Sequence, residues 1–384
     1  NKLTLAERFL DDIYELEPKN DEVFIQKANI LSKQDQHLKA IDCLKIALDL
    51  TNDPADVYSL LGMEYLFLDD FYKAKDHFIK CLEIDDQDYA SLYNVMYCFD
   101  YLELYKEAIQ FLNKFLDKNP YSEIAWHQIG KQYYALGEYK KSLTAFDFAI
   151  ISDDLFIGAY LEKGKTLEKL DRFAEAIESY AITLELDDPT SFALLRMGIC
   201  YERLGHTKTA GKYFHQTIKE DPLLDKGWVA IINYYLNLKD SNKALYYINK
   251  ALEVDNQNIS YWKQYALVNH ALDFFEEAEI GLRKMLNLGN YELETWTKRA
   301  DILQVLGEYE AAIDNLEEAQ EFYPDNAEII FRLAGLHYML KENEAAQRYL
   351  RNGLKIDPEF VIIIEELFPN IFKQEIVQDI ITKY

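Results

Sequence analysis

The chain has 384 residues, of which 49% are hydrophobic and 28% are charged, with only 14 glycines and 8 prolines. This composition excludes a disordered or linker-rich chain and is typical of a well-solvated protein with an extensive apolar core. The formal net charge of −26 argues against nucleic acid and anionic membranes as partners, because both carry charge of the same sign.

Targeting and cysteine signals are few. No apolar run approaches the ~20 residues that span a bilayer, so we expect no membrane insertion. The chain begins at Asn1 rather than methionine, which is typical of a fragment, so a targeting segment that has been removed stays an alternative.

Cys43, Cys81, Cys98 and Cys200 form no CxxC pair and fall on helical stretches. We interpret them as small core residues in a reducing, cytoplasmic compartment, with disulfide partners as the alternative.

The first predicted element is an amphipathic helix over residues 3–16. Ala6, Leu10 and Ile13 lie at helical spacing along it. In the register of the repeats that follow, residues 1–20 correspond to the second helix of a truncated repeat, so we expect the chain to start inside a longer array. An N-terminal capping helix is the alternative.

A helix–turn–helix pattern then recurs every 34 residues, and residues 126–148 show it most clearly. Apolar residues follow helical spacing on both sides of Gly137 and Glu138, which interrupt the pattern. One such hairpin cannot bury its apolar face alone, so it is expected to be one unit of a stack. Ten copies cover residues 21–360, starting at residues 21, 55, 89, 123, 157, 191, 225, 259, 293 and 327.

Five positions of the repeat carry the physical argument. The fourth is mostly large and holds all four tryptophans, and the eighth is mostly small. The twentieth is alanine in nine copies and Ser142 in the other, which marks a close helix crossing where a larger side chain would cost ~1–3 kcal/mol. The twenty-fourth is large and apolar. The thirty-second is Pro, Asn or Asp, residue types that end helices and favour turns.

Together these positions resemble the tetratricopeptide repeat (TPR) family. The fourth copy carries the family pattern most fully, in Trp126, Ile129, Gly130, Tyr133, Ser142 and Phe146. The resemblance implies an all-α fold, a right-handed α-solenoid superhelix of helix–turn–helix repeats. Large residues replace small ones at Met96, Phe115, Ile232 and Met285. Near these residues we predict slightly wider helix spacing.

Residues 361–384 are predicted to form C-terminal capping helices. A very apolar helix is broken at Pro369, and an amphipathic helix follows it. Terminal repeats are often atypical because one of their faces meets water. The alternative is a self-association surface formed by Ile362, Ile363 and Ile381.

No motif indicates catalysis. HExxH, GxSxG and GxGxxG are absent, and the seven histidines show no metal-ligand spacing. Residues 164–166 read Gly-Lys-Thr, but a phosphate-binding loop needs a glycine where Ala159 stands and a preceding strand. His337 falls on the buried face of its helix and is interpreted as a core residue. We therefore expect no enzymatic activity, no cofactor and no metal site.

In the family, first helices line a concave groove that binds peptides and proteins, and the resemblance implies that repeat positions 2, 5, 9, 12 and 13 face it. Basic, amide and aromatic side chains gather at these positions. The candidate binding residues are Tyr93, Tyr97, Tyr101, His127, Lys131, Tyr134, Lys165, Lys169, Arg203, Asn233, Asn237 and Lys263.

These residues predict a non-enzymatic scaffold that binds an extended, acidic partner segment. Distant carboxylates count for little inside the groove, because charge is screened over ~8 Å. The sequence does not match the pattern of chaperone-tail clamps, which combines Lys at repeat position 5 with Asn at position 9. Asn233 stands at position 9 of a repeat with Val229 at position 5, and Lys263 stands at position 5 of a repeat with Leu267 at position 9. Alternatively, the lysines only pair with neighbouring glutamates and the tyrosines only pack on the next helix. Two further alternatives are the substrate-recruiting arm of a larger enzyme and a structural subunit that assembles through its end repeats.

Overall fold

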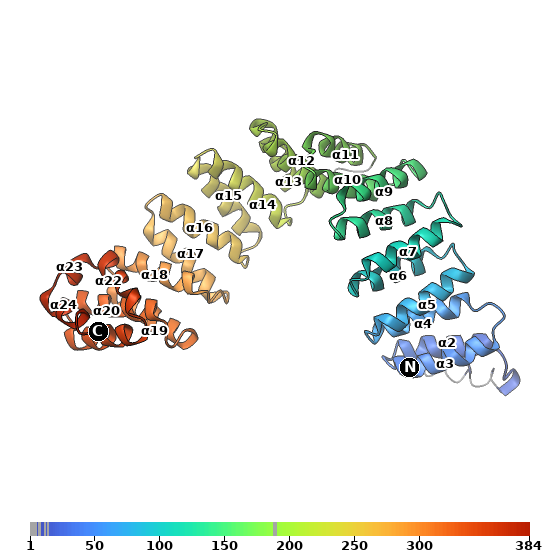
Figure 1. The fold of residues 1–384 in the computed structure, drawn as a ribbon, viewed down its shortest axis with the longest axis horizontal. Helices are drawn as coiled ribbons and strands as arrows, with labels where there is room; N and C mark the ends of the chain where they lie inside the picture. The colour runs from blue at the N-terminus through green and yellow to red at the C-terminus, as the bar shows by residue number, and fades with distance from the viewer. Residues whose placement is uncertain (1–5, 7–8, 11–12, 14, 187–189) are drawn as a thin grey trace. The chain divides into compact units, whose positions relative to one another are not determined.

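The computed structural model describes residues 6, 9–10, 13, 15–186 and 190–384, and its regular secondary structure over these residues is helical (Figure 1). The prediction of a truncated repeat at residues 1–20 lies largely outside the described residues. No helix of the described chain is long and apolar enough to cross a membrane.

Helices α2 to α21 follow one another in pairs, and each pair begins 34 residues after the previous one. The first helices are α2 (Asp21–Ser32), α4 (Ala55–Phe67), α6 (Tyr89–Tyr101), α8 (Glu123–Ala135), α10 (Ile157–Lys169), α12 (Ser191–Arg203), α14 (Asp225–Asn237), α16 (Ile259–Ala271), α18 (Leu293–Leu306) and α20 (Ala327–Met339). The second helices are α3 (His37–Leu50), α5 (Phe71–Ile84), α7 (Tyr105–Leu116), α9 (Tyr139–Ser152), α11 (Phe173–Leu186), α13 (Thr207–Glu220), α15 (Ser241–Val254), α17 (Phe275–Asn287), α19 (Tyr309–Phe322) and α21 (Asn343–Ile356). We propose these pairs as ten repeats over residues 21–360.

The C-terminal residues form four short helices, η1 (Pro358–Val361), α22 (Ile362–Leu367), α23 (Pro369–Phe372) and α24 (Glu375–Ile381). Phe368 is buried against Gly335 of α20, where an added Cβ would lie 2.2 Å from the ring. Ile363 is also buried, whereas Ile362 is 51% exposed. Most of the apolar surface of this segment is therefore used internally, and we propose it as a cap.

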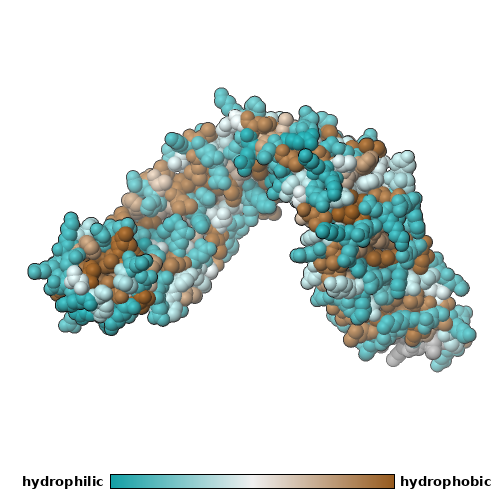
Figure 2. Space-filling view, in the orientation of Figure 1, coloured by the Kyte–Doolittle hydropathy of each residue, from teal (hydrophilic) through white to brown (hydrophobic). Residues whose placement is uncertain are grey.

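The chain divides into two compact units, residues 1–188 and residues 189–384. Unit 1 contains α2–α11, and unit 2 contains α12–α24. In each unit a buried apolar core passes from one helix pair to the next. Figure 2 shows hydrophobic residues on the surface of both units among a majority of hydrophilic ones.

Turn and cap chemistry explains where the helices start. Side chains cap several first helices: the carboxylate of Asp88 accepts from the Ser91 N–H at 3.0 Å, and the Ser122 hydroxyl accepts from the Ala125 N–H at 3.2 Å. Within every pair, the fifteenth residue of the repeat has a positive φ and reverses the chain. These residues are Asp35, Asp69, Glu103, Gly137, Asp171, Gly205, Lys239, Asp273, Gly307 and Lys341.

In eight of the ten pairs, the eighth and twenty-fourth positions compensate each other in volume. Where the eighth is glycine, its Cα lies against an aromatic ring: a Cβ on Gly130 would lie 2.4 Å from Phe146, and one on Gly164 would lie 2.5 Å from Tyr180. Gly62 and Gly198 face phenylalanines in the same way. In the other six pairs the eighth residue is Ala, Met or Ile, and the twenty-fourth is Leu or Ile. Ser142, the exception to alanine at the twentieth position, donates to the Gly130 carbonyl at 2.8 Å.

Two second helices end early. Helix α7 has 12 residues and α17 has 13, whereas the other second helices have 14. These are the two repeats with a bulky twenty-seventh residue, Phe115 and Met285. Position 27 faces the next pair: a Cβ on Gly227 would lie 2.9 Å from the Thr217 side chain. A large residue there changes the connection, while the predicted wider helix spacing stays a prediction.

The cysteines have the properties of structural thiols. Cys81, Cys98 and Cys200 are buried, and Cys43 is half-buried. Burial raises the pKa of Cys81 to about 11 and that of Cys98 to about 12, so neither thiol ionises readily.

Candidate functional site

Three tyrosines of the predicted site lie along α6 in unit 1. Tyr93, Tyr97 and Tyr101 are 44%, 56% and 61% exposed. Tyr101 stacks on Phe71 of the preceding pair, with ring centroids 3.7 Å apart, and Tyr97 is tilted over the same ring at 6.1 Å. One face of the Tyr101 ring is thus covered by Phe71, and about half of each of the three side chains remains accessible.

Lys131 follows on α8 and points toward the preceding first helix. Its Nζ lies 3.9 Å from the Asp100 Oδ2, and each side chain is close to 40% exposed. The Gln132 amide holds the other Asp100 oxygen, donating from Nε2 at 2.7 Å. The Gln132 amide therefore holds Asp100 in place, whereas the pair between Asp100 and Lys131 is loose. The Lys131 ammonium group can donate to another carboxylate.

His127 lies one turn before Lys131 and contributes a ring rather than a cation. It packs against Phe146 at 5.7 Å and meets Phe156 edge-on at 5.2 Å between centroids. Burial, and then the charges of Lys131 and Lys165, lower the pKa of His127 to about 4. His127 is therefore neutral near pH 7. The two lysines, from adjacent first helices, both lie close enough to influence this ring.

The remaining predicted residues of unit 1 are on α8 and α10. Lys165 donates to the Glu162 carboxylate at 2.6 Å, which is the local pairing that the alternative interpretation anticipated. Tyr134 meets Tyr139 edge-on at 5.4 Å. Lys169 is exposed and forms no ion pair within the described part of the chain. Charge at this surface is thus nearly balanced, in a chain that is strongly acidic overall.

The other four predicted residues belong to unit 2. Arg203, Asn233, Asn237 and Lys263 are all exposed. The Asn237 amide donates to Glu202 at 3.3 Å. The twelve predicted residues therefore fall into two sets on two units, eight from Tyr93 to Lys169 and four from Arg203 to Lys263.

Unit 2 also contains a cavity of about 340 Å³, lined by α16, α17 and α18. Its lining comprises Lys263, Ala266, Leu267, His270, Leu282, Met285, Glu294, Thr295, Lys298, Asp301 and Ile302. Only Lys263 was among the predicted site residues. The sequence signal that could have located this cavity is Met285, at a position that is small in most repeats.

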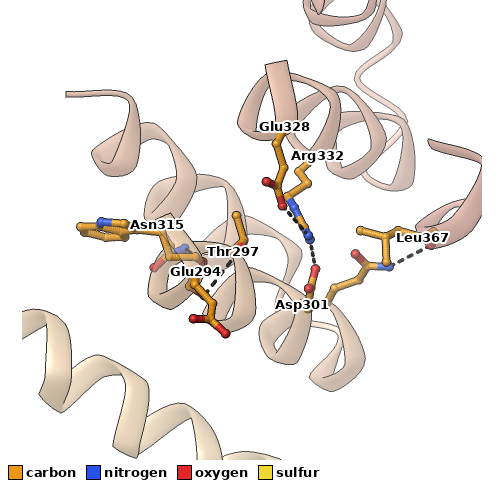
Figure 3. Close-up of polar contacts among 9 residues, drawn as sticks. Glu294, Thr297, Asp301, Asn315, Glu328, Arg332 and Leu367 are labelled. Atoms are coloured by element: carbon orange, nitrogen blue, oxygen red, sulfur yellow. Dashed lines mark hydrogen bonds and ion pairs between the residues drawn. The ribbon is translucent and has the colours of Figure 1, made fainter. Parts of the chain in front are cut away.

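A polar network holds α18 in place beside this cavity. Figure 3 shows Arg332 reaching from α20 to the carboxylates of Asp301 and Glu328. Burial raises the pKa of Asp301, even though the charge of Arg332 opposes the shift. On the opposite side of α18, Arg299 pairs with Glu279 of α17 at 2.7 Å. The walls of the cavity are therefore fixed by ion pairs between helices.

Metal-binding clusters are not evident among the described residues. The described residues hold no group of three or more His, Cys, Asp or Glu side chains that could bind a metal ion. His337 is 8% exposed, stacks on Tyr349 at 5.2 Å and bonds Glu342 through Nδ1 at 2.6 Å. These contacts agree with its interpretation as a core residue.

Comparison with known proteins identifies the family. Tetratricopeptide repeat models match residues 55–88, 127–189, 192–223 and 306–361. The chain is a tetratricopeptide repeat protein. The predicted family and the predicted all-α repeat fold are thus confirmed, and the TPR fold supports a role as a protein-interaction scaffold.

Two relatives show over how much of its length this TPR chain is similar to known proteins. A TPR repeat-containing protein of Methanocaldococcus jannaschii is 26% identical over 305 residues, 74% of this chain and 53% of that protein. Anaphase-promoting complex subunit 3 of Schizosaccharomyces pombe is 20% identical over 334 residues, 87% of this chain and 45% of that protein. The chain thus spans about half the length of these relatives.

Two solved TPR structures match parts of this chain at low sequence identity. The C-terminal part of a TPR repeat-containing protein from Cytophaga hutchinsonii matches with a TM-score of 0.49 and 17% identity, covering 62% of this chain and 98% of that one. YrrB, titled a TPR protein with an unusual peptide-binding site, matches with a TM-score of 0.37 and 22% identity, over 48% of this chain and 95% of that one.

Proposed function

We propose that this TPR protein is a non-enzymatic scaffold and that unit 1 binds an extended, acidic segment of a partner protein across α6, α8 and α10. The observation that carries the proposal is the row of half-exposed tyrosines on α6, which continues into Lys131 on α8. We place the protein in a reducing, cytoplasmic setting, which the buried thiols support.

Tyrosines suit this role because they offer large contact area with little side-chain entropy to lose. The Tyr101 ring stacks on Phe71 and the Tyr97 ring lies tilted near it, so these two rings are partly ordered before a partner arrives. An extended segment that covers them would exchange exposed apolar area for buried area, worth ~25 cal/mol per Å².

The acidic preference comes from Lys131 and Lys165. Asp100 and Glu162 offset these charges, so the surface is close to neutral rather than repulsive. A ligand carboxylate could approach Lys131, because the native pair with Asp100 is long, at 3.9 Å. Charge-assisted contacts of this kind shorten to ~2.8 Å when geometry allows. Selectivity for acidic segments should therefore be modest and should decline as salt rises.

The test is a selection from a random peptide library with immobilised full-length chain. We expect enrichment of extended peptides that carry Asp or Glu, and loss of this enrichment in a Tyr97→Ser/Lys131→Glu variant. The matched control is Tyr121→Ser/Lys118→Glu, which changes the same residue types in the α7–α8 connection of unit 1. Tyr121 is 78% exposed.

Recovery of the same peptides by the site variant would overturn the proposal, as would equal losses in the site and control variants. Circular dichroism at 222 nm checks that all three proteins are equally helical before the selections are compared. Repeating the selection at ~1 M salt, where the Debye length is ~3 Å, should reduce the preference for acidic residues while leaving contacts to the tyrosines.

A further inference from the structure

We infer that the cavity among α16, α17 and α18 in unit 2 is a second docking site, and that it receives a large apolar side chain from an acidic segment of a partner protein. The inference shares with the proposed function the premise that first-helix surfaces bind partner segments. It uses a different unit and no residue of the tyrosine surface, so the two can fail separately.

The cavity lies where the repeat departs from its pattern. Met285 and Thr295 occupy positions 27 and 3 of consecutive repeats, the positions where Thr217 meets Gly227 in another pair. Both residues line the cavity. Helix α17 is one residue short and continues into Gly289, whose φ is +91°.

The tryptophan of the next helix shows the same departure. The indole N–H of Trp126 donates to the Pro120 carbonyl at 3.0 Å, and that of Trp228 donates to the Pro222 carbonyl at 2.8 Å. These carbonyls belong to position 32 of the preceding repeat. Trp296 is 1% exposed, and its Nε1 has no hydrogen-bond partner in the described structure. The α17–α18 connection therefore differs from its counterparts in several independent features.

The interior of the cavity is apolar and of useful size. Its apolar lining consists of the side chains of Ala266, Leu267, Leu282, Met285 and Ile302. A volume of about 340 Å³ lies within the ~300–1,000 Å³ typical of ligand sites and exceeds one leucine or phenylalanine side chain. Leu267 remains 42% exposed, so the cavity opens to solvent along the first helix. An apolar side chain suits this interior better than water, which finds few polar partners there.

The charges at the rim determine which flanking residues fit. Lys298 pairs with Glu294 at 2.6 Å, and Asp301 pairs with Arg332. His270 meets Phe275 edge-on at 5.6 Å. Lys263 is exposed and forms no ion pair within the described rim, although its charge, after that of Lys298, helps to lower the pKa of Glu294. A carboxylate beside the apolar side chain of the partner would therefore complement Lys263 without displacing an existing pair.

Methionine methyl groups provide the readout. The chain has five methionines, so [methyl-¹³C]methionine labelling gives five resonances. Met285 lines the cavity, while Met63 reports on unit 1, since its sulfur lies 3.4 Å from the Asn94 amide on α6. Met285→Leu and Met63→Leu assign the two signals. The probe is the peptide acetyl-Glu-Glu-Phe-Glu-Glu-amide, compared with the same peptide carrying Ala in place of Phe.

We expect the phenylalanine peptide to shift the Met285 resonance in a saturable manner and the alanine peptide to bind about tenfold more weakly or not at all. Leu267→Trp fills the mouth of the cavity and should abolish the shift. Lys263→Glu leaves the cavity intact and should weaken binding about tenfold at low salt. The matched controls in unit 2 are Leu238→Trp, at a leucine that is 48% exposed, and Lys284→Glu; both should bind normally.

An unmoved Met285 resonance with the phenylalanine peptide would overturn the inference, and so would equal responses to the two peptides. A full Met285 response in both Leu267→Trp and Lys263→Glu would overturn it as well. A shift of Met63 without Met285 would support the proposed function while refuting the second site. A shift of the Met285 resonance without a shift of the Met63 resonance would support the second site and would count against the proposed function for this peptide.

Discussion

Helix pairs α8–α9 and α16–α17 follow one sequence pattern, yet they fill the space around them differently. In the first pair Gly130 lies against the Phe146 ring, and Phe146 is fully buried. In the second pair Ala266 and Leu282 occupy the same two positions, and both line a cavity of about 340 Å³. The repeat pattern therefore specifies the helix crossing without specifying how densely each crossing is packed.

The difference teaches which positions act locally and which act between repeats. The eighth and twenty-fourth residues belong to one pair, and in eight of the ten pairs either glycine accompanies an aromatic residue or alanine accompanies leucine. The twenty-seventh residue contacts the next pair, so Met285 is accompanied by a shorter helix and an altered connection. Volume is thus conserved within most pairs, whereas the bulky Met285 between pairs lies beside open space.

Truncating the twenty-fourth residue should give the largest contrast. Phe146→Ala removes a fully buried ring and should lower the free energy of unfolding by ~3–5 kcal/mol. Leu282→Ala should cost only ~2 kcal/mol, because this side chain already borders empty space and loses fewer contacts. Urea denaturation of the full chain, followed by circular dichroism, measures both. Equal losses would mean that the cavity does not reduce packing around Leu282.

The fifth position extends the comparison to pH, because it is the buried His127 in one pair and the exposed Lys263 in the other. The pKa of His127 is about 4 in the folded chain and ~6.5 when unfolded, so the unfolded state binds more protons between these values. Its contribution to stability is complete above pH ~6.5 and is lost as pH falls toward 4. We expect a loss of ~2 kcal/mol between pH 7 and pH 5 from this group.

His127→Phe keeps a ring of similar size and should flatten the dependence of unfolding free energy on pH across this interval. Lys263→Gln is the matched control at the equivalent position and should leave the dependence unchanged. The difference between variant and native chain isolates His127 from the other histidines. An unchanged pH dependence in His127→Phe would show that the ring is solvated in the folded state.

The twenty-seventh position can be tested by placing a methionine where the chain has alanine. Ala149 is fully buried at this position of the fourth repeat, where α9 has its full 14 residues. Ala149→Met should therefore overpack the contact with α10 and cost ~1–2 kcal/mol. Ala135→Met, at an exposed alanine of α8, should be nearly neutral. Thermal unfolding compares the stabilities of the two variants. If Ala149→Met leaves stability unchanged, a bulky twenty-seventh residue is not the cause of the shortened helices.

Much of the fold was readable from the sequence. The small residues, the tryptophans and the helix-ending residues at 34-residue spacing predicted an all-α TPR chain, and both the fold and the family are confirmed. Local spacing suffices for this because each helix pair buries its face against its neighbours in the same way. The division into two units near residue 188 has no comparable local signal, and the prediction did not include it.

The site was less predictable because it depends on the positions of the charged and aromatic groups at the ends of the side chains. Spacing placed Lys131 and Lys165 on the same surface but could not show that one pairs loosely with Asp100 and the other tightly with Glu162. Spacing also named His127 as a candidate binding residue but could not show that burial keeps its ring neutral. The cavity in unit 2 needs three helices to define it, so Met285 alone could only signal a departure. Binding by the twelve predicted residues stays a prediction.

The smallest effect tests the compensation within a pair. Gly130→Ala should cost only ~1 kcal/mol, because overpacking against Phe146 at ~1–3 kcal/mol is partly offset by a gain of ~1 kcal/mol in helix propensity. Adding Phe146→Leu should recover most of this loss, since alanine at the eighth position stands beside leucine at the twenty-fourth in four repeats of this chain.

Gly158→Ala separates the two contributions. An added Cβ at Gly158 would meet the Phe156 ring at 3.5 Å, an ordinary contact, so this variant should be stabilised by the propensity term alone. A double-mutant cycle on the unfolding free energies then gives the coupling between positions 8 and 24. Simple additivity of Gly130→Ala and Phe146→Leu would show that the two residues vary together in sequence without acting on each other in the folded chain.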